Sequence, residues 1–134
     1  MSINSWKFSA RLFVFTWFFV GGVSHFAFPQ SFIKIVPPYI PYPELCVFVS
    51  GAFELLGAFG LWIKSLRSLA GYGLMCLTVV ITLANVQMYL HPELFPSIPE
   101  WLLILRFTIQ ALLIWLIWWC SRPEYKGLAI THQL

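Results

Sequence analysis

Four long apolar stretches dominate this chain, and its prolines separate them. All nine prolines of the 134 residues lie between or after these stretches, and none lies within them. A proline inside a helix removes a hydrogen bond and clashes with the preceding turn, so this placement is typical of uninterrupted helices. A helix needs about 20 mainly apolar residues to cross a bilayer. The sequence therefore predicts membrane-spanning helices at about 9–28, 45–62, 68–90 and 100–120.

Composition supports an integral membrane protein. Hydrophobic residues make up 60% of the chain and charged residues only 10%, whereas about a quarter of the residues of a soluble domain are charged. We expect an all-α protein with one domain over residues 1–134, a membrane-embedded four-helix bundle with a C-terminal tail at 121–134. Lys7 and Arg11 before the first apolar stretch also resemble the start of a signal peptide, but no small-x-small cleavage site follows.

The basic residues predict how the chain is oriented. They gather at the two ends of the chain and in the connection between the second and third helices. These residues are Lys7, Arg11, Lys64, Arg67, Arg122 and Lys126, whereas the other two connections hold only Lys34, together with Glu44, Glu93 and Glu100. By the positive-inside rule both termini are cytoplasmic. The net charge of +3 then reflects topology, and no basic patch indicates nucleic acid as a partner.

The connection at 29–43 is unusual, because it carries five prolines and many apolar residues. The prolines prevent a long helix, and the apolar side chains do not suit a free loop. We expect this segment to lie in the outer interface, with one short turn of helix, and to cap the bundle. It is then either a functional lid or a tightly packed connector.

Glu54 and Arg106 each interrupt an apolar helix. A charge at the centre of a membrane helix costs about 2.5–3.5 kcal/mol on insertion scales, so it calls for a partner, a wet cavity or a function. The predicted topology brings both to the outer half of the membrane, at depths of about 15 and 9 Å, where the two charges can neutralise each other. Polar residues of the other helices reach the same level. The candidate ligand-binding residues are His25, Ser50, Glu54, Asn85, Arg106 and Gln110.

Two interpretations of these residues stay open. In the first, they form a hydrogen-bonded network that only fixes the order of the helices. In the second, they line a small cavity, open to the outside, that binds a ligand or moves protons. Small residues flank Glu54, and we expect them to allow close helix approach; they are Gly51, Gly57, Ala58 and Gly60.

Several short motifs, in order, resemble the DoxX family of small bacterial membrane proteins. They are Gly-Gly-Val-Ser-His25-Phe26, Ile35-Val36-Pro37-Pro38, Ser50-Gly51-Ala52-Phe53-Glu54-Leu55-Leu56-Gly57, Gly71-Tyr72-Gly73-Leu74, Ala84-Asn85-Val86-Gln87-Met88 and Arg106-Phe107-x-x-Gln110. The resemblance runs from about residue 21 to residue 115. It implies a four-helix membrane bundle and a link to quinone oxidoreduction, and its pattern residues here are His25, Glu54, Asn85, Arg106 and Gln110.

No cofactor motif accompanies these residues. Cys46, Cys76 and Cys120 form no C-x-x-C pair and lie at three depths, so we expect packed thiols rather than a disulfide relay. His25 and His91 both come near the outer surface, but His91 precedes a proline at a helix end, which disfavours haem ligation by the two. No metal site is predicted.

Three functions therefore remain. The first is an accessory subunit of a membrane oxidoreductase, in which Arg106 and His25 bind a quinone and Glu54 is the candidate proton acceptor. The second is a non-catalytic module that binds a lipophilic molecule or a partner membrane protein. The third is a proton-coupled carrier of small solutes, which four short helices disfavour unless the chain forms a homo-oligomer. The lipid bilayer is the partner common to all three.

Overall fold

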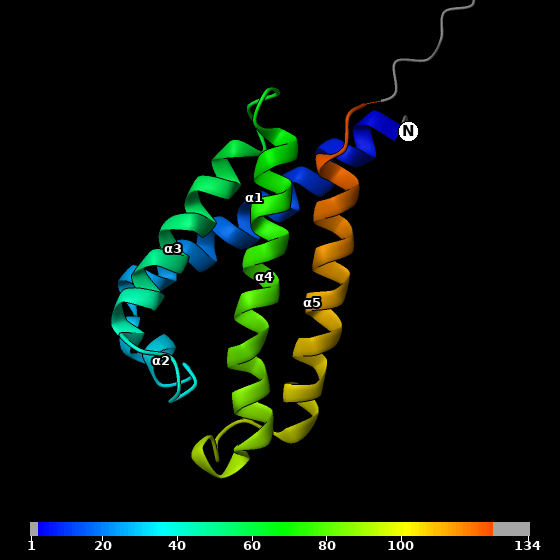
Figure 1. The fold of residues 1–134 in the computed structure, drawn as a ribbon. Coiled ribbons are helices and arrows are strands. Elements are labelled where there is room, and N and C mark those ends of the chain that lie inside the picture. The colour runs from blue at the N-terminus through cyan, green and yellow to red at the C-terminus, as the bar shows by residue number, and fades with distance from the viewer. Residues whose placement is uncertain (1–2, 125–134) are drawn as a thin grey trace, which may run out of the picture.

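A computed structural model describes residues 3–124, and every regular element in that range is a helix. The short elements are α2 (Pro29–Ile33) and the 3₁₀ helix η1 (Pro92–Leu94). The four long helices, each apolar and long enough to cross a membrane, are α1 (Ile3–Ala27), α3 (Pro43–Gly60), α4 (Arg67–Leu90) and α5 (Glu100–Ser121) (Figure 1). The chain is therefore a multi-pass membrane protein by the length and composition of its helices.

The prolines set most of the helix ends, as expected. Pro43 is the first residue of α3, where its missing N–H costs nothing, and α4 ends just before Pro92. Seven of the eight predicted ends lie within two residues of the observed ones. The exception is α1, which begins at Ile3 rather than Ser9. The basic residues near its start lie within the helix, because Lys7 donates to the carbonyl of Arg122 (3.4 Å) beyond α5.

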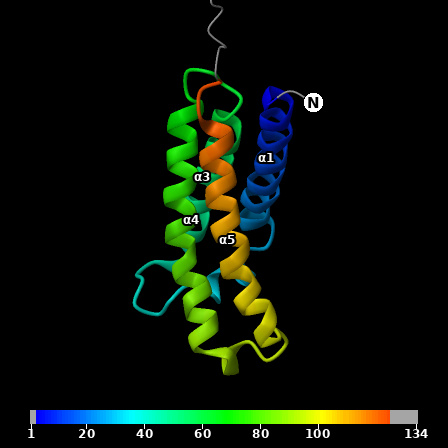
Figure 2. The same ribbon diagram turned by 90° about the vertical axis from the view of Figure 1, so that its right-hand side faces the viewer.

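The long helices form two pairs that meet at one end of the molecule. α1 packs along α3, α4 packs along α5, and the pairs touch through α3 with α4 and α1 with α5. The two pairs diverge towards the end that carries α2 and η1 (Figures 1 and 2). The start of α1 and the end of α5 lie together at the opposite end (Figure 1). Lys126 and the rest of the predicted tail, residues 125–134, fall outside the described part of the chain.

The main apolar cluster lies in the half of the bundle where α1 begins and α5 ends, which we call the packed half. Its members come from all four long helices, and most are almost completely buried. They are Ala10, Val14, Phe18, Ala58, Leu61, Leu74, Leu113, Ile117 and Cys120. The half towards α2 and η1, where the helix pairs diverge, is called the open half. Its buried side chains include polar ones, and it holds the candidate site.

The connection at 29–43 contains the expected short helix, but it does not cap all four long helices. α2 packs on α1 and α3, with no comparable contact to α4 or α5. The apolar side chains of Phe32, Val36 and Ile40 line one edge of the space between the helix pairs. The segment therefore extends one wall of that space.

Candidate functional site: a cavity between the helix pairs

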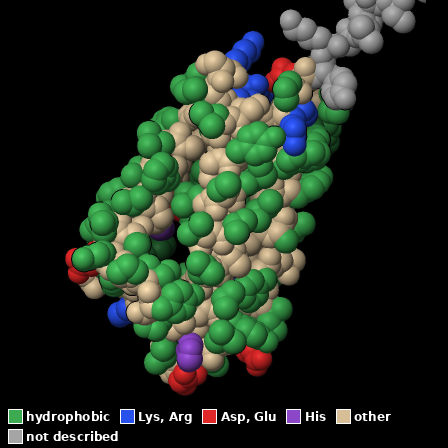
Figure 3. Space-filling view, viewed as in Figure 1, with side chains coloured by type: hydrophobic (Ala, Val, Ile, Leu, Met, Phe, Trp, Pro, Cys, Tyr) green, Lys and Arg blue, Asp and Glu red, His purple; other side chains and the backbone are tan. Residues whose placement is uncertain are grey.

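A cavity of about 850 Å³ lies in the open half, between the pair α1 and α3 and the pair α4 and α5. A space-filling view shows it as a hollow in the surface, with histidine and acidic atoms in its depth (Figure 3). Most of its lining is apolar. All six candidate residues line it: His25, Ser50, Glu54, Asn85, Arg106 and Gln110. The sequence thus identified residues that the fold does bring together around one space.

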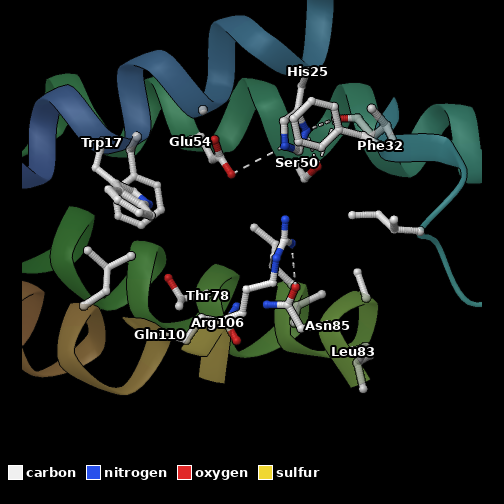
Figure 4. A pocket seen from close by; sticks show the side chains of 18 of the residues that line it. Trp17, His25, Phe32, Ser50, Glu54, Thr78, Leu83, Asn85, Arg106 and Gln110 are labelled. Carbon is white, nitrogen blue, oxygen red and sulfur yellow. Dashed lines mark hydrogen bonds and ion pairs between the residues drawn. The ribbon is translucent and has the colours of Figure 1, made fainter. Parts of the chain in front are cut away.

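The first polar group lies on the wall made by α1 and α3 (Figure 4). The His25 Nδ1 lies 2.9 Å from the Val47 carbonyl oxygen and 3.0 Å from the Ser50 hydroxyl. The Ser50 hydroxyl also donates to the Val47 carbonyl (2.9 Å). When Nδ1 carries the proton and donates to Val47, the Nε2 of the neutral ring is an acceptor. This Nε2 lies 3.7 Å from the Glu54 Oε1, which is longer than a hydrogen bond.

The Glu54 carboxylate is therefore only partly satisfied. Its side chain is 7% exposed, and no residue in the range 3–124 bonds its Oε2. This oxygen lies beside Gly21, where an added Cβ would come within 2.6 Å of it. A buried carboxylate oxygen with no donor is costly, and it is either solvated or reserved for a ligand.

Close packing of α1 on α3 fixes this wall. A Cβ on Gly51 would lie 2.7 Å from the Cβ of His25, and one on Gly22 would lie 2.9 Å from the Gly51 carbonyl oxygen. The two backbones can approach this closely only because both positions lack a side chain. The small residues around Glu54 therefore allow close helix approach, as expected, and they hold the histidine against the serine.

The second polar group lies on the opposite wall, made by α4 and α5 (Figure 4). The Arg106 Nη1 donates to the Asn85 Oδ1 (3.1 Å) and contacts the Met88 sulfur (3.7 Å). Neither Nη2 nor Nε donates to any acceptor among the described residues. A little deeper, the Thr82 hydroxyl donates to the Gln110 Oε1 (3.1 Å). This wall consequently offers guanidinium donors, whereas the first wall offers acceptors.

The expected contact between Glu54 and Arg106 is not formed. The carboxylate lies beside His25, and the guanidinium bonds Asn85 on the other side of the cavity (Figure 4). Residue spacing along the helices predicts similar membrane depths for the two charges, but it does not give the separation of the helix pairs. That separation depends on apolar packing in the other half of the bundle, so a pattern of polar residues alone does not encode it.

Some participants were missed by the sequence analysis, and some predictions need correction. The ring of Phe32 lies against that of His25, with centroids 4.0 Å apart and planes tilted by 38°. No signal in the sequence pairs this phenylalanine of α2 with that histidine. The three free thiols differ in exposure: Cys120 is buried, Cys46 is half-buried and Cys76 is exposed. The prediction of packed thiols is therefore wrong for Cys76.

His91 lies outside the cavity and contacts Glu93 (3.1 Å).

Comparison with known proteins gives one match. The model of a family described as a domain of unknown function (DUF8561) matches residues 14–121, a segment that contains all six candidate residues. No curated protein and no solved structure matches the chain.

Proposed function

This chain belongs to the DUF8561 family of domains of unknown function, and we propose that its cavity binds a lipophilic molecule whose head group carries two polar ends, a quinone or its quinol. One observation carries the proposal. On one wall the Glu54 Oε1 lies 3.7 Å from the His25 Nε2, and both can accept a hydrogen bond. On the other wall Arg106 has N–H groups without acceptors, across an apolar space. A quinol that bridges the walls satisfies both sets at once, because its hydroxyl groups both accept and donate.

The size and lining of the cavity suit such a ligand. Small-molecule sites typically enclose roughly 300–1,000 Å³ and combine apolar walls with a few convergent polar groups. The cavity of about 850 Å³ falls in that range. It lies between helices that cross the membrane, so a lipophilic molecule reaches it from the bilayer without entering water. A water-soluble solute would gain less from the aromatic and aliphatic side chains that form most of the lining.

Five of the six candidate residues have a defined part in this proposal. The free N–H groups of Arg106 donate to one oxygen of the head group, while Asn85 holds the guanidinium in place. The hydroxyl at the other end donates its hydrogen bond to Glu54, beside the His25 imidazole that Ser50 orients. When an associated oxidoreductase takes the two electrons of the quinol, Glu54 accepts the proton of this hydroxyl, and the proton of the second hydroxyl leaves to water.

The choice of a quinone rests on the resemblance of the motifs to the DoxX family, and the cavity by itself specifies only the two-ended chemistry. The same resemblance motivates the proposal that the chain acts as an accessory subunit of a membrane oxidoreductase. We further propose a bacterial inner-membrane location with both termini cytoplasmic. The support is the crowding of basic residues at the end of the bundle that carries the termini (Figure 3).

Ligand retention tests this function. Protein purified from membranes in a mild detergent is extracted, and its lipophilic molecules are identified by mass spectrometry. Binding of a short-chain benzoquinol, kept reduced, is then titrated beside that of its benzoquinone. Loss of a charged hydrogen bond costs about 1.5–3 kcal/mol, so Arg106→Gln is expected to weaken binding by roughly 10- to 100-fold. Lys34→Gln removes the same charge from an exposed position outside the cavity and is expected to change binding less than about twofold.

Two results would reject the proposal. One is a wild-type protein that neither retains a lipophilic molecule nor binds the added benzoquinol or benzoquinone. The other is binding that Arg106→Gln and Lys34→Gln weaken equally, because the cavity would then have no specific part in it.

A further inference from the structure

A second, smaller recess of about 170 Å³ lies between α4 and α5 in the packed half, and none of its lining residues lines the cavity. It sits where α5 ends at Ser121 and α4 begins at Arg67, hence at the boundary between apolar span and polar surface. Its lining residues are Ser68, Tyr72, Met75, Trp118, Ser121 and Arg122, with Pro123.

Arg122 is held at this recess by aromatic rings rather than by an acid. Its guanidinium carbon lies 4.8 Å from the ring centroid of Trp118 and 5.8 Å from that of Tyr72. Lys7 donates to the backbone carbonyls of Arg122 (3.4 Å) and Pro123 (3.3 Å), which fixes the chain as it leaves α5. Cation–π contacts leave the in-plane N–H groups of a guanidinium free to donate.

Two side chains of the recess, Arg122 and Tyr72, have polar atoms without hydrogen-bond partners in the described part of the chain. Within residues 3–124, no side chain or carbonyl accepts a hydrogen bond from the Arg122 guanidinium, and the Tyr72 hydroxyl has no bonded neighbour. The serine hydroxyls of the recess do have acceptors: Ser68 donates to the Ser121 carbonyl (3.3 Å) and Ser121 to the Trp118 carbonyl (3.3 Å). An oriented guanidinium beside a phenol is a donor set that suits an oxyanion.

The charges around the recess also favour an anion. Glu124 is the one acidic residue at this end of the described chain. Its carboxylate is already engaged by Arg11 (2.8 Å) and by Arg67 (3.4 Å). The guanidinium of Arg122 is therefore not neutralised by a neighbouring carboxylate, and the surrounding cations raise the local positive potential.

The surface below the recess is apolar. Tyr72, Trp118 and Trp115 are 51%, 42% and 57% exposed, and Met75 closes the recess on the side of the membrane centre. A soluble anion would use only the donors, whereas a lipid would use the donors and this apolar flank together. We propose that this recess binds the phosphate of an anionic phospholipid, with Arg122 and Tyr72 as donors and an acyl chain along the exposed flank of α4 and α5.

Counting bound lipids by native mass spectrometry tests this proposal. The purified full-length chain is titrated at constant salt with phosphatidylglycerol, with phosphatidylcholine and with inorganic phosphate. Loss of the charged donor in Arg122→Gln is expected to weaken the first phosphatidylglycerol by about tenfold or more, and Tyr72→Phe by about threefold. Lys64→Gln removes the same charge at the same end from an exposed position that does not line the recess, and is expected to change binding less than about twofold.

The alternatives give different results. Phosphatidylglycerol binding that Arg122→Gln leaves unchanged, or that Lys64→Gln weakens equally, would overturn the proposal in favour of general attraction to a basic surface. Inorganic phosphate that binds as tightly as phosphatidylglycerol, and depends on Arg122 in the same way, would overturn the assignment to a lipid. None of the three variants alters a cavity residue, and an unchanged midpoint of thermal unfolding in detergent serves as the check that they are folded.

Discussion

The two halves of the bundle use the same four helices in opposite ways. In the packed half, side chains such as Val14, Leu74 and Ile117 are 0–1% exposed and fill the space between the helix pairs. In the open half, the same pairs separate around a cavity of about 850 Å³, and the buried side chains that face it include His25 and Glu54. Residues that stabilise the fold and residues that could contact a ligand are thus separated along the helices.

The packed half and the open half contribute different properties to the protein. Inside a membrane the lipid tails are as apolar as leucine, so helices associate through close packing and through polar contacts. The packed half supplies the close packing, for example where a Cβ on Gly60 would lie 2.7 Å from the Cβ of Ala70. The open half can therefore keep polar atoms without partners, because the other half holds the helices in register.

Truncation of one leucine in each half should give the largest contrast. Leu74 is 1% exposed in the core, whereas Leu83, on the same helix, lines the cavity and is 41% exposed. Leu74→Ala leaves a void and should lower the free energy of unfolding by roughly 2–5 kcal/mol. Leu83→Ala should lower it by less than about 0.5 kcal/mol. Equal losses, measured by unfolding in mixed micelles, would show that the two halves are packed alike.

Two glycines of α4 provide a second contrast. A Cβ on Gly71 would collide with the side chain of Ser121, whereas one on Gly73 would meet nothing within 4 Å. Gly71→Val should therefore cost about 1–3 kcal/mol by overpacking the contact of α4 with α5. Gly73→Val is the matched control and should be nearly neutral in thermal unfolding. A destabilised Gly73→Val protein would show that helix propensity, rather than close approach, decides the result.

A double-mutant cycle tests whether the two walls of the cavity are coupled. Glu54 and Arg106 share no partner, so the effects of Glu54→Gln and Arg106→Gln on the free energy of unfolding should add within about 0.5 kcal/mol. In a buried ion pair, either single change would cost about 3–5 kcal/mol, and the double change would restore much of it. Such recovery would mean that the walls close on each other.

The smallest expected effect is at the terminal end of the packed half. The hydrogen bond from Arg11 and the nearby positive charges lower the pKa of Glu124 below its ordinary value. A carboxyl whose pKa is lower in the folded state stabilises the fold above its ordinary pKa, and this contribution disappears as the pH falls through the lower value. The protection factors of the amides at the end of α5, which correct for the intrinsic exchange rate at each pH, should therefore fall below about pH 4.

Glu124→Gln should lower the protection factors at the end of α5 already at neutral pH and should remove their dependence on pH in the acid range. Glu93→Gln, at the other end of the molecule, is the control and should leave the end of α5 unchanged. An acid dependence that survives in Glu124→Gln would assign the effect to a different carboxyl.

Much of the fold could be predicted because the membrane imposes it. Hydrophobic runs and prolines such as Pro43 and Pro92 gave the helices and most of their ends. The start of α1 was misplaced, because Lys7 looked like a flanking charge and is in fact satisfied by carbonyls beyond α5. That contact joins residues 115 positions apart, and local patterns carry no information about it.

The members of the candidate site could also be predicted, since polar residues in apolar helices are few. The contacts that these residues make with one another could not be predicted. Glu54 lies beside His25 rather than Arg106 because the glycines at positions 22 and 51 bring α1 and α3 together, while the packed half sets the distance to α5. The contact of Phe32 with His25 depends on the path of a proline-rich connection, which hydropathy does not specify.

An experimental density map of the protein in lipid nanodiscs prepared from native membranes would test most directly whether the cavity holds a ligand between its two walls. We expect the helix pairs to stay separated in the open half, with elongated non-protein density that extends from the Arg106 guanidinium to Glu54 and His25. Closed walls, with the Glu54 carboxylate against the Arg106 guanidinium and no volume between them, would contradict it.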